Sequence, residues 1–306
     1  MKNTHSLVPN KEVAIQVQGL TKSYGKVRAL RGIDLQVQRG EIFGFLGPNG
    51  AGKTTTIRCM LDMIRPDGGK VLLLGLNPQV DPVAVQSRTG YLPGEMQYYD
   101  NLTSERQLRF FNDMRDGRAE WDYVHQLADR LALDLNQPIK NLSKGNKQKV
   151  GVIQALMHKP ELLLLDEPTG GLDPLMQQEV LGLLRQANSI GTTIFFSSHI
   201  LSEVENLAQR VAIIRSGEIV EITNTSNLTH NSVNRITIRF KQPTEFTELV
   251  KLPGVEVLSL VDQTSLTLQV TGDMEMLVHA LGNLPVLDLE TERPSLEEVF
   301  LTYYKK

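Results

Sequence analysis

The sequence of 306 residues has little cysteine, little excess charge and no long apolar run. Its single cysteine, Cys59, excludes a disulfide within the chain and is typical of a reducing compartment. The formal net charge of −3 provides no strong field to attract nucleic acid or an anionic membrane surface. A membrane-spanning helix needs about 20 apolar residues, far more than runs such as residues 162–165 offer. We therefore expect a soluble cytoplasmic protein that reaches a membrane only through a partner.

A glycine-rich segment, residues 47–54, matches the phosphate-loop pattern G-x-x-x-x-G-K-[ST] at every fixed position. It follows a predicted buried strand, residues 41–46, and precedes a predicted helix start, residues 55–61. Glycines let the backbone wrap a phosphate closely, and the helix N-terminus adds partial positive charge. Lys53 is expected to reach the β- and γ-phosphates and the Thr54 hydroxyl to ligate Mg²⁺. A plain strand-to-helix turn is the alternative, but the flanking pattern favours nucleotide binding. The residues expected to line this loop are Gly47, Pro48, Asn49, Gly50, Ala51, Gly52, Lys53, Thr54 and Thr55.

Strand and helix patterns alternate along the first part of the chain, after a loose polar tail over residues 1–11. This alternation predicts a parallel α/β sheet with right-handed crossovers over residues 12–222, with a helical subdomain at about residues 95–158. The predicted strands are 13–17, 29–37, 41–46, 70–74, 161–166 and 192–197, and the clearest helical patterns are 103–132 and 174–189.

A polar stretch at residues 223–227 predicts a linker, and the pattern then restarts as β-α-β-β-α-β. This order predicts a small ferredoxin-like α+β domain over residues 228–306, which ends in a helix at residues 295–304. The segment has no cysteine cluster, glycine-rich loop or basic run. Docking or dimerisation is therefore a better expectation for it than catalysis.

Four leucines followed by two carboxylates, residues 162–167, predict a buried strand with acidic residues at its carboxyl end. In phosphate-loop NTPases that place holds the second Mg²⁺-coordinating group. Asp166 is expected to hold Mg²⁺, through water, and Glu167 to polarise the attacking water as general base. An ordinary strand with an exposed acidic end is the alternative for this pattern alone.

Between these two motifs, residues 142–145 read Leu-Ser-Lys-Gly and resemble the L-S-G-G-Q signature of the ATP-binding cassette (ABC) family. The sequence departs from that signature at Lys144 and Asn146, whereas Gln148 fits a later glutamine of the family. In physical terms, Ser143 and Gly145 offer a hydroxyl and a bare backbone at a helix N-terminus, which suits an anion. A simple helix cap is the alternative.

Further residues extend the resemblance in the family's order. Tyr24 stands where the family has an aromatic residue that stacks on adenine. Asp173 lies in Gly-Leu-Asp, which resembles the loop that crosses a dimer interface, and otherwise caps a helix before Pro174. His199 follows a strand and resembles the switch histidine that contacts the γ-phosphate. One departure is Gly94, where the family commonly has a glutamine that helps to coordinate Mg²⁺; we expect Glu95 to serve instead.

The resemblance covers residues 13–221 and implies a phosphate-loop ATPase that uses ATP and Mg²⁺. The tail around residues 294–300 is similar to the extension of bacterial cassettes that export drugs and antibiotics. The resemblance implies a head-to-tail homodimer, in which ATP would lie between Lys53 and Thr54 of one copy and Ser143 and Gly145 of the other.

The same resemblance implies a separate polytopic membrane subunit, which would dock on the helical stretch at about residues 98–135 and hold the protein at the inner face of the cell membrane. A soluble ABC ATPase that acts on ribosomes or nucleic acid is the main alternative. Such proteins usually carry two cassettes or a long coiled-coil insertion, and this chain has neither, nor a basic stripe. No nucleic-acid partner is expected. A phosphate-loop kinase is a further alternative, but such an enzyme would not explain the pattern of Ser143, Gly145 and His199.

Overall fold

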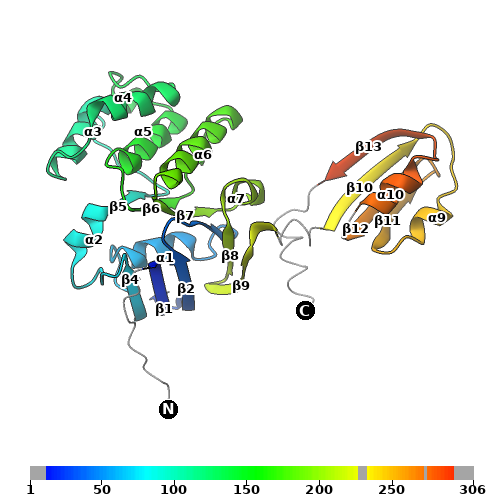
Figure 1. Ribbon diagram of the computed structural model, residues 1–306, viewed down its shortest axis with the longest axis horizontal. Helices are drawn as coiled ribbons and strands as arrows, with labels where there is room; N and C mark the ends of the chain where they lie inside the picture. The colour runs from blue at the N-terminus through cyan, green and yellow to red at the C-terminus, as the bar shows by residue number, and fades with distance from the viewer. Residues whose placement is uncertain (1–11, 227–232, 272–273, 293–306) are drawn as a thin grey trace, which may run out of the picture. The chain divides into compact units, whose positions relative to one another are not determined.

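The computed structural model describes residues 12–226, 233–271 and 274–292, and it divides into two compact units between Ile222 and Thr223 (Figure 1). Each unit has its own cluster of buried apolar side chains. Three expectations concern residues outside the described ranges. They are the polar tail at residues 1–11, the segment at 294–300 that resembles exporting cassettes, and the last helix at residues 295–304.

The first unit is built on a six-stranded sheet in the order β5-β6-β7-β3-β8-β9. The neighbours from β5 to β8 run parallel. Every residue of β3, β6 and β7 is buried, as expected for central strands covered on both faces. Because parallel strands share one carboxyl edge, this order brings the ends of β3, β6 and β7 together. The strands are β3 (Ile42–Leu46), β5 (Thr89–Leu92), β6 (Leu162–Asp166), β7 (Thr193–Ser198), β8 (Arg210–Arg215) and β9 (Glu218–Asn224).

A second sheet of the first unit corrects the expectation of one parallel sheet. Strands β1 (Val13–Tyr24), β2 (Val27–Gln38) and β4 (Gly68–Leu73) form a separate antiparallel sheet in the order β2-β1-β4. A two-residue turn joins Tyr24 to Val27, with Gly25 at φ 58°. Such a turn pairs neighbouring strands antiparallel, whereas parallel strands need a crossover of a dozen or more residues.

The expected helical stretch at residues 103–132 is two helices, α3 (Ser104–Asp113) and α4 (Trp121–Arg130). The chain turns between them at Asp116 and Gly117, which both have positive φ. In Figure 1 these helices form a cluster with α5 (Lys144–Leu156) above the six-stranded sheet. None of the helices in the described part of the chain is long and apolar enough to cross a membrane.

Other helices flank the two sheets of the first unit, and Cys59 of α1 is buried in the apolar core, as a small core residue would be. Burial raises the pKa of its thiol to about 11. These helices are α1 (Lys53–Met60), α2 (Pro82–Arg88), a short 3-10 helix (Ile139–Asn141), α6 (Pro174–Ser189) and α7 (Leu201–Leu207).

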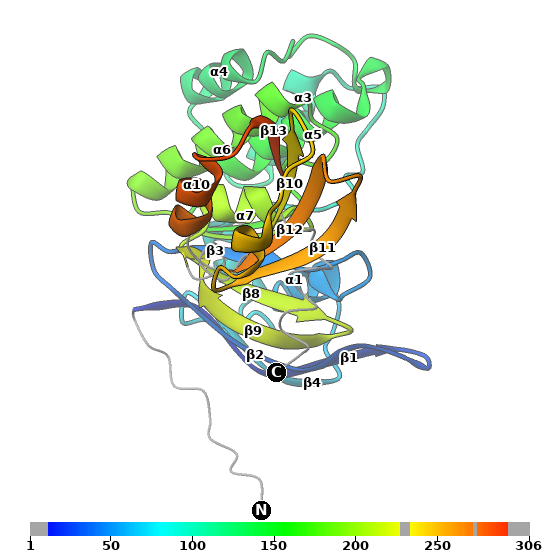
Figure 2. The ribbon, with the colours of Figure 1, turned by 90° about the vertical axis from the view of Figure 1, so that its right-hand side faces the viewer.

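The second unit is an antiparallel sheet in the order β11-β12-β10-β13 with two short helices. Figures 1 and 2 show both helices on the same face of this sheet, the face whose side chains form the buried cluster. The helix expected at residues 243–251 is only one turn long. In chain order the elements are β10 (Val233–Phe240), α9 (Thr247–Val250), β11 (Val255–Val261), β12 (Ser265–Thr271), α10 (Glu275–Leu281) and β13 (Val286–Glu292).

Candidate nucleotide-binding site

The phosphate loop connects β3 to α1, as its pattern predicts. Two of its glycines leave no room for a side chain. A Cβ on Gly47 would lie 2.4 Å from the carbonyl oxygen of Ile214, and one on Gly52 would lie 2.8 Å from that of Ala29. Gly52 also has φ 114° and is the N-cap residue of α1, so the backbone N–H groups that begin this helix remain open for an anion.

The Lys53 ammonium is buried inside this loop. Its Nζ donates to the carbonyl oxygens of Gly47 at 2.7 Å and Pro48 at 3.2 Å. It also lies 3.4 Å from Oε1 of Glu167. Phosphate oxygens entering the loop would replace these neutral carbonyl acceptors with charged ones, which form stronger hydrogen bonds.

Asp166 lies at the carboxyl end of β6 and accepts a hydrogen bond on each carboxylate oxygen. The Thr54 hydroxyl donates to Oδ2 at 2.6 Å, and the Ser197 hydroxyl donates to Oδ1 at 2.6 Å. The pair of Thr54 and Asp166 supplies hard oxygen atoms, the ligands that Mg²⁺ prefers. The described residues hold no group of three or more His, Cys, Asp or Glu side chains arranged around a metal. Such a sparse donor set fits Mg²⁺, which usually keeps several waters and binds substrate phosphates.

Glu167 lies between a cation and an imidazole. Its Oε1 is 3.2 Å from Nδ1 of His199 and 3.4 Å from Nζ of Lys53. Its backbone has φ 52°, a left-handed conformation that is unfavourable for a side chain of this size. The Gln148 amide stabilises this turn, because it donates to the carbonyl oxygens of Glu167 and Pro168, both at 3.1 Å. The fold therefore directs the carboxylate toward Lys53 and His199.

Some supporting residues had no assigned role in the sequence analysis. The Ser197 hydroxyl accepts from the backbone N–H of Glu167 at 3.0 Å and donates to Asp166, so it links the Asp166 carboxylate to the backbone of Glu167. Buried Glu203 accepts from the hydroxyls of Thr169 and of Ser198, which precedes His199. In the sequence, the signal for these supporting roles was limited to the polar residues at the carboxyl end of β7, because the groups that they bind lie on other elements.

Ser143 and Asp173 cap helices, as the plainer interpretation of each predicted. The Ser143 hydroxyl accepts from the backbone N–H of Asn146 at 3.1 Å, and the Asp173 carboxylate accepts from that of Met176 at 3.0 Å. The two segments are neighbours, because a Cβ on Gly145 would lie 2.9 Å from the Gly171 carbonyl oxygen. In the described residues, no hydrogen bond joins these caps to the phosphate loop.

Tyr24 and Glu95 are both exposed at the edge of the site region. The Tyr24 ring is 49% exposed at the tip of the β1–β2 hairpin, with Lys22 Nζ 5.8 Å from its centroid. A Cβ on Gly94 would lie 3.0 Å from Oδ2 of Asp166, so the backbone of this loop touches the candidate metal ligand. Glu95 follows immediately, and its carboxylate forms no hydrogen bond or ion pair within the described residues.

Comparisons with known proteins agree with this geometry. The model of the family described as "ABC transporter" matches residues 30–170. The bacitracin transport ATP-binding protein BcrA of Enterococcus faecalis is 37% identical over 71% of each chain. The daunorubicin resistance ATP-binding protein DrrA3 of Streptomyces coeruleorubidus is 33% identical over 95% of each chain. A solved structure described as the ATP-binding subunit of an ABC transporter is 29% identical and superposes with a TM-score of 0.64, covering 70% of this chain and 91% of its own.

A match that spans nearly the whole length of a relative, together with the phosphate loop beside Asp166 and Glu167, identifies both the fold and the chemistry. The chain belongs to the ABC transporter family, within which it is an ATP-binding protein that hydrolyses ATP.

Proposed function

We propose that this chain is the ATP-hydrolysing subunit of a two-component exporter and drives a separate polytopic membrane subunit. The observation that carries the proposal is the cluster of Lys53, Glu167 and His199 beside the pair of Thr54 and Asp166. The relatives named for bacitracin transport and daunorubicin resistance support export of an antibiotic or a similar compound.

In the proposed reaction, water attacks the γ-phosphorus of ATP, and Glu167 accepts the proton from that water as ADP and phosphate form. Lys53 donates to the β- and γ-phosphates, and His199 contacts the γ-phosphate while it keeps Glu167 oriented. Thr54, Asp166 and Glu95 would hold Mg²⁺, with Glu95 acting in place of the family's glutamine. When bound, the ion neutralises negative charge on the phosphate oxygens.

The proposal includes dimerisation, with the site divided between two copies of the chain. Ser143 and Gly145 are not joined by hydrogen bonds to the phosphate loop of their own chain. We propose that they contact the nucleotide of a second copy, with Asp173 at the interface and Tyr24 on the adenine. Two copies would then close around two ATP molecules, and hydrolysis would reopen them.

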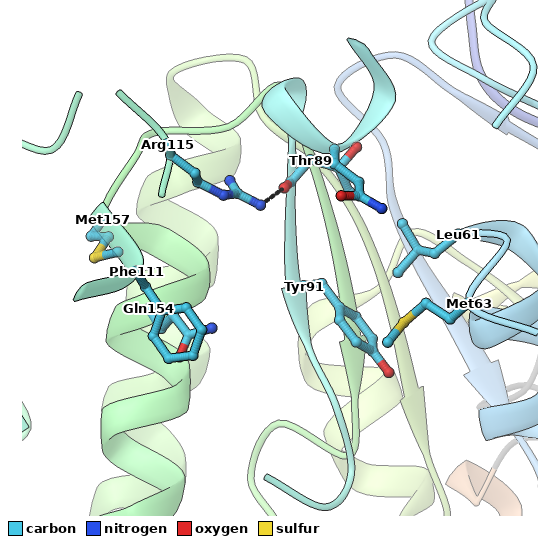
Figure 3. A pocket seen from close by; sticks show the side chains of 9 residues that line it. Leu61, Met63, Thr89, Tyr91, Phe111, Arg115, Gln154 and Met157 are labelled. Atoms are coloured by element: carbon cyan, nitrogen blue, oxygen red, sulfur yellow. Dashed lines mark hydrogen bonds between the residues drawn. The ribbon is translucent and has the colours of Figure 1, made fainter. Parts of the chain in front are cut away.

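The helical cluster carries a surface suited to the membrane subunit. A cavity of about 230 Å³ lies between β5, α3, α5 and the segment after α1 (Figure 3). Its apolar lining includes Leu61, Met63, Phe111 and Met157. Met114, next to the cavity, is 69% exposed. An exposed apolar surface beside a cavity is typical of an interaction site.

We also propose the domain limits and the location of the protein. Residues 12–222 would be the nucleotide-binding domain, with a helical subdomain at about 95–158, and residues 228–306 a ferredoxin-like accessory domain. The strand order β11-β12-β10-β13 supports the ferredoxin-like assignment. The protein would be cytoplasmic and peripheral, held at the inner face of the cell membrane through its membrane subunit.

The test is purification of the tagged full chain from detergent-solubilised membranes of its native host, followed by mass spectrometry. We expect a polytopic protein without a phosphate loop in stoichiometric amount, and we expect it to change the ATPase rate of the chain when the two are reconstituted. Recovery of ribosomal or nucleic-acid-bound proteins alone would leave the ATPase intact and overturn the transport function.

A further inference from the structure

We propose that Arg115 anchors an acidic side chain of the membrane subunit, so that the partner segment carries a carboxylate among apolar residues. This inference rests on the proposed function and specifies the chemistry of its partner. Arg115 follows α3 and lines two adjoining hollows, a cavity of about 230 Å³ with mixed polar and apolar walls and a groove of about 500 Å³. Figure 3 shows its guanidinium extending across the cavity to the backbone of Thr89.

Arg115 is a largely buried cation without a carboxylate partner in the described part of the chain. Within the described residues, its side chain makes one hydrogen bond, from Nη2 to the carbonyl oxygen of Thr89 at 3.0 Å. Burial and the neighbouring charge of Arg118 both lower the pKa of the Arg115 guanidinium. A guanidinium has five N–H donors in a planar fork that fits a carboxylate, so most of its capacity is open.

The nearby carboxylates are already engaged by other cations. Asp116 is 3.4 Å from Arg118, and Glu161 is 2.6 Å from Arg88. The groove lining contains Arg88, Arg115, Arg118 and Lys159 but only the carboxylates Asp116 and Glu161. The local field is therefore positive, and the uncompensated charge is the one at Arg115.

Two polar side chains that line the same hollows have unpaired atoms among the described residues. Thr89 is 1% exposed, and its hydroxyl has no hydrogen-bond partner among the described residues. Neither ring nitrogen of His158 has one either. Burial is the main cause that lowers the pKa of His158, and the positive charges of Arg115 and Arg118 lower it further, to about 4. The imidazole is therefore neutral at pH 7 and keeps one N–H donor. Buried polar groups normally have partners, so the described residues around Arg115 leave polar groups unsatisfied.

The walls of the cavity favour a protein side chain over a free anion or a lipid headgroup. Leu61, Met63, Phe111 and Met157 would contact the neighbours of the carboxylate, and these neighbours must be apolar to gain from burial. A helical segment with one acidic residue beside apolar residues satisfies both the positive charge and the apolar walls.

The experiment uses the full chain and the membrane subunit recovered with it, reconstituted in detergent. Acidic residues in the cytoplasmic loops of that subunit are changed one at a time, Asp to Asn and Glu to Gln, and the dissociation constant is measured. We expect Arg115→Gln to weaken binding about tenfold or more, and one of the neutralised acids to do the same. The two changes combined should be no worse than either alone, because both remove the same interaction.

Arg118→Gln is the matched control, because Arg118 lies on the same turn, is 59% exposed and is already paired with Asp116. It should weaken binding by no more than about threefold. The anchor would be overturned if Arg115→Gln and Arg118→Gln weakened binding to the membrane subunit equally. It would also be overturned if the loss of affinity from Arg115→Gln added to the loss from each neutralised acid in turn. The latter result would leave a lipid or a free anion as the ligand of Arg115.

A purely structural role for Arg115 predicts a different result in the isolated chain. Loss of a structural hydrogen bond to Thr89 would lower the Tm, whereas removal of an unpaired buried charge should leave the Tm unchanged or raise it. If Arg115→Gln does not fold, Arg115→Lys keeps the charge but not the fork, and an intermediate loss of binding is expected. Failure to recover any polytopic protein would overturn the proposed function together with the anchor, whereas recovery followed by additive losses would overturn the anchor alone.

Discussion

At the scale of single residues, the site depends on where one carboxylate is held. Glu167 is directed by a left-handed backbone conformation and by hydrogen bonds from Gln148 to its own carbonyl and the next one. Its side chain lies within 3.4 Å of Lys53 and 3.2 Å of His199. The neighbouring Asp166 faces Thr54 and Ser197 instead. Adjacent carboxylates thus have different partners, which suits separate roles in proton transfer and metal binding.

Glu167→Gln should abolish most hydrolysis and leave ATP binding intact. Glutamine keeps the shape of the side chain but cannot accept the proton, and loss of a general base costs about 10²–10⁴-fold in rate. Phosphate release measures the rate, and size-exclusion chromatography with ATP should show a persistent closed dimer. Glu248→Gln, an exposed change on α9, is the control and should hydrolyse ATP normally. Rapid turnover by Glu167→Gln would show that another group is the base.

Glu95→Ala tests the loop that replaces the family's glutamine. Gly94 has no side chain that could bind Mg²⁺ beside Asp166, so we expect the carboxylate of the next residue, Glu95, to reach the ion. We expect the apparent Mg²⁺ affinity in ATP hydrolysis to fall by about tenfold, with weaker coupling to the membrane subunit. Titration of Mg²⁺ at saturating ATP measures this effect. An unchanged titration and unchanged coupling would mean that water completes the metal shell.

At the scale of elements, hydrogen bonds to one residue of α7 connect the segments that follow β6 and end β7. Glu203 of α7 is buried and accepts from Thr169, after β6, and from Ser198, the last residue of β7. His199 comes directly after this contact. The position of His199 therefore depends on hydrogen bonds to a residue in the first turn of the next helix.

Glu203→Leu should destabilise the first unit by about 2 kcal/mol, because it removes the carboxylate that accepts from two buried hydroxyls. Thr169 then has no acceptor among the described residues, and Ser198 keeps only the longer contact of 3.3 Å to the Ile200 carbonyl oxygen. Since those hydroxyls position the segment before His199, the ATPase rate should also fall. Thermal unfolding and phosphate release measure the two effects, and Glu248→Leu in the second unit is the control. A variant with wild-type stability would mean that water or a backbone carbonyl replaces the lost acceptor.

At the scale of the whole molecule, each of the two compact units has an apolar cluster of its own among the described residues. All residues of one cluster lie between Ala14 and Ile214, and all residues of the other lie between Ile236 and Leu281. The candidate nucleotide site is confined to the first unit. A unit with its own core can in principle fold alone.

A fragment of residues 1–226 should therefore fold and bind ATP within about threefold of the full chain's affinity. Fluorescent-nucleotide binding and circular dichroism test this expectation, with Lys53→Ala in the fragment as the control that should lose binding. A fragment that is unfolded, or that binds ATP far more weakly, would show that the second unit supports the nucleotide site.

Much of the fold could be predicted where local pattern and long-range structure agree. The buried runs at β3, β6 and β7 read as central strands because both faces of each strand are apolar. The antiparallel sheet of β1, β2 and β4 could not be distinguished in this way, since alternation does not reveal which strands pair. The split between α3 and α4 was also missed, because Met114 and Trp121 are seven residues apart and so fit one helical pattern, although Asp116 and Gly117 turn the chain between them.

The phosphate loop, the acidic pair at the end of β6 and the family could be recognised in the amino-acid sequence, because those signals are short and carried by adjacent residues. Which groups meet depends on the folded chain: the Thr54 hydroxyl reaches Asp166 across 112 positions of sequence, and Glu167 lies between Lys53 and His199. The tertiary structure also shows that Arg115 has no carboxylate partner among the described residues. The physical reason is strand order, since side chains at the carboxyl edge become neighbours only after long-range pairing places β3, β6 and β7 side by side.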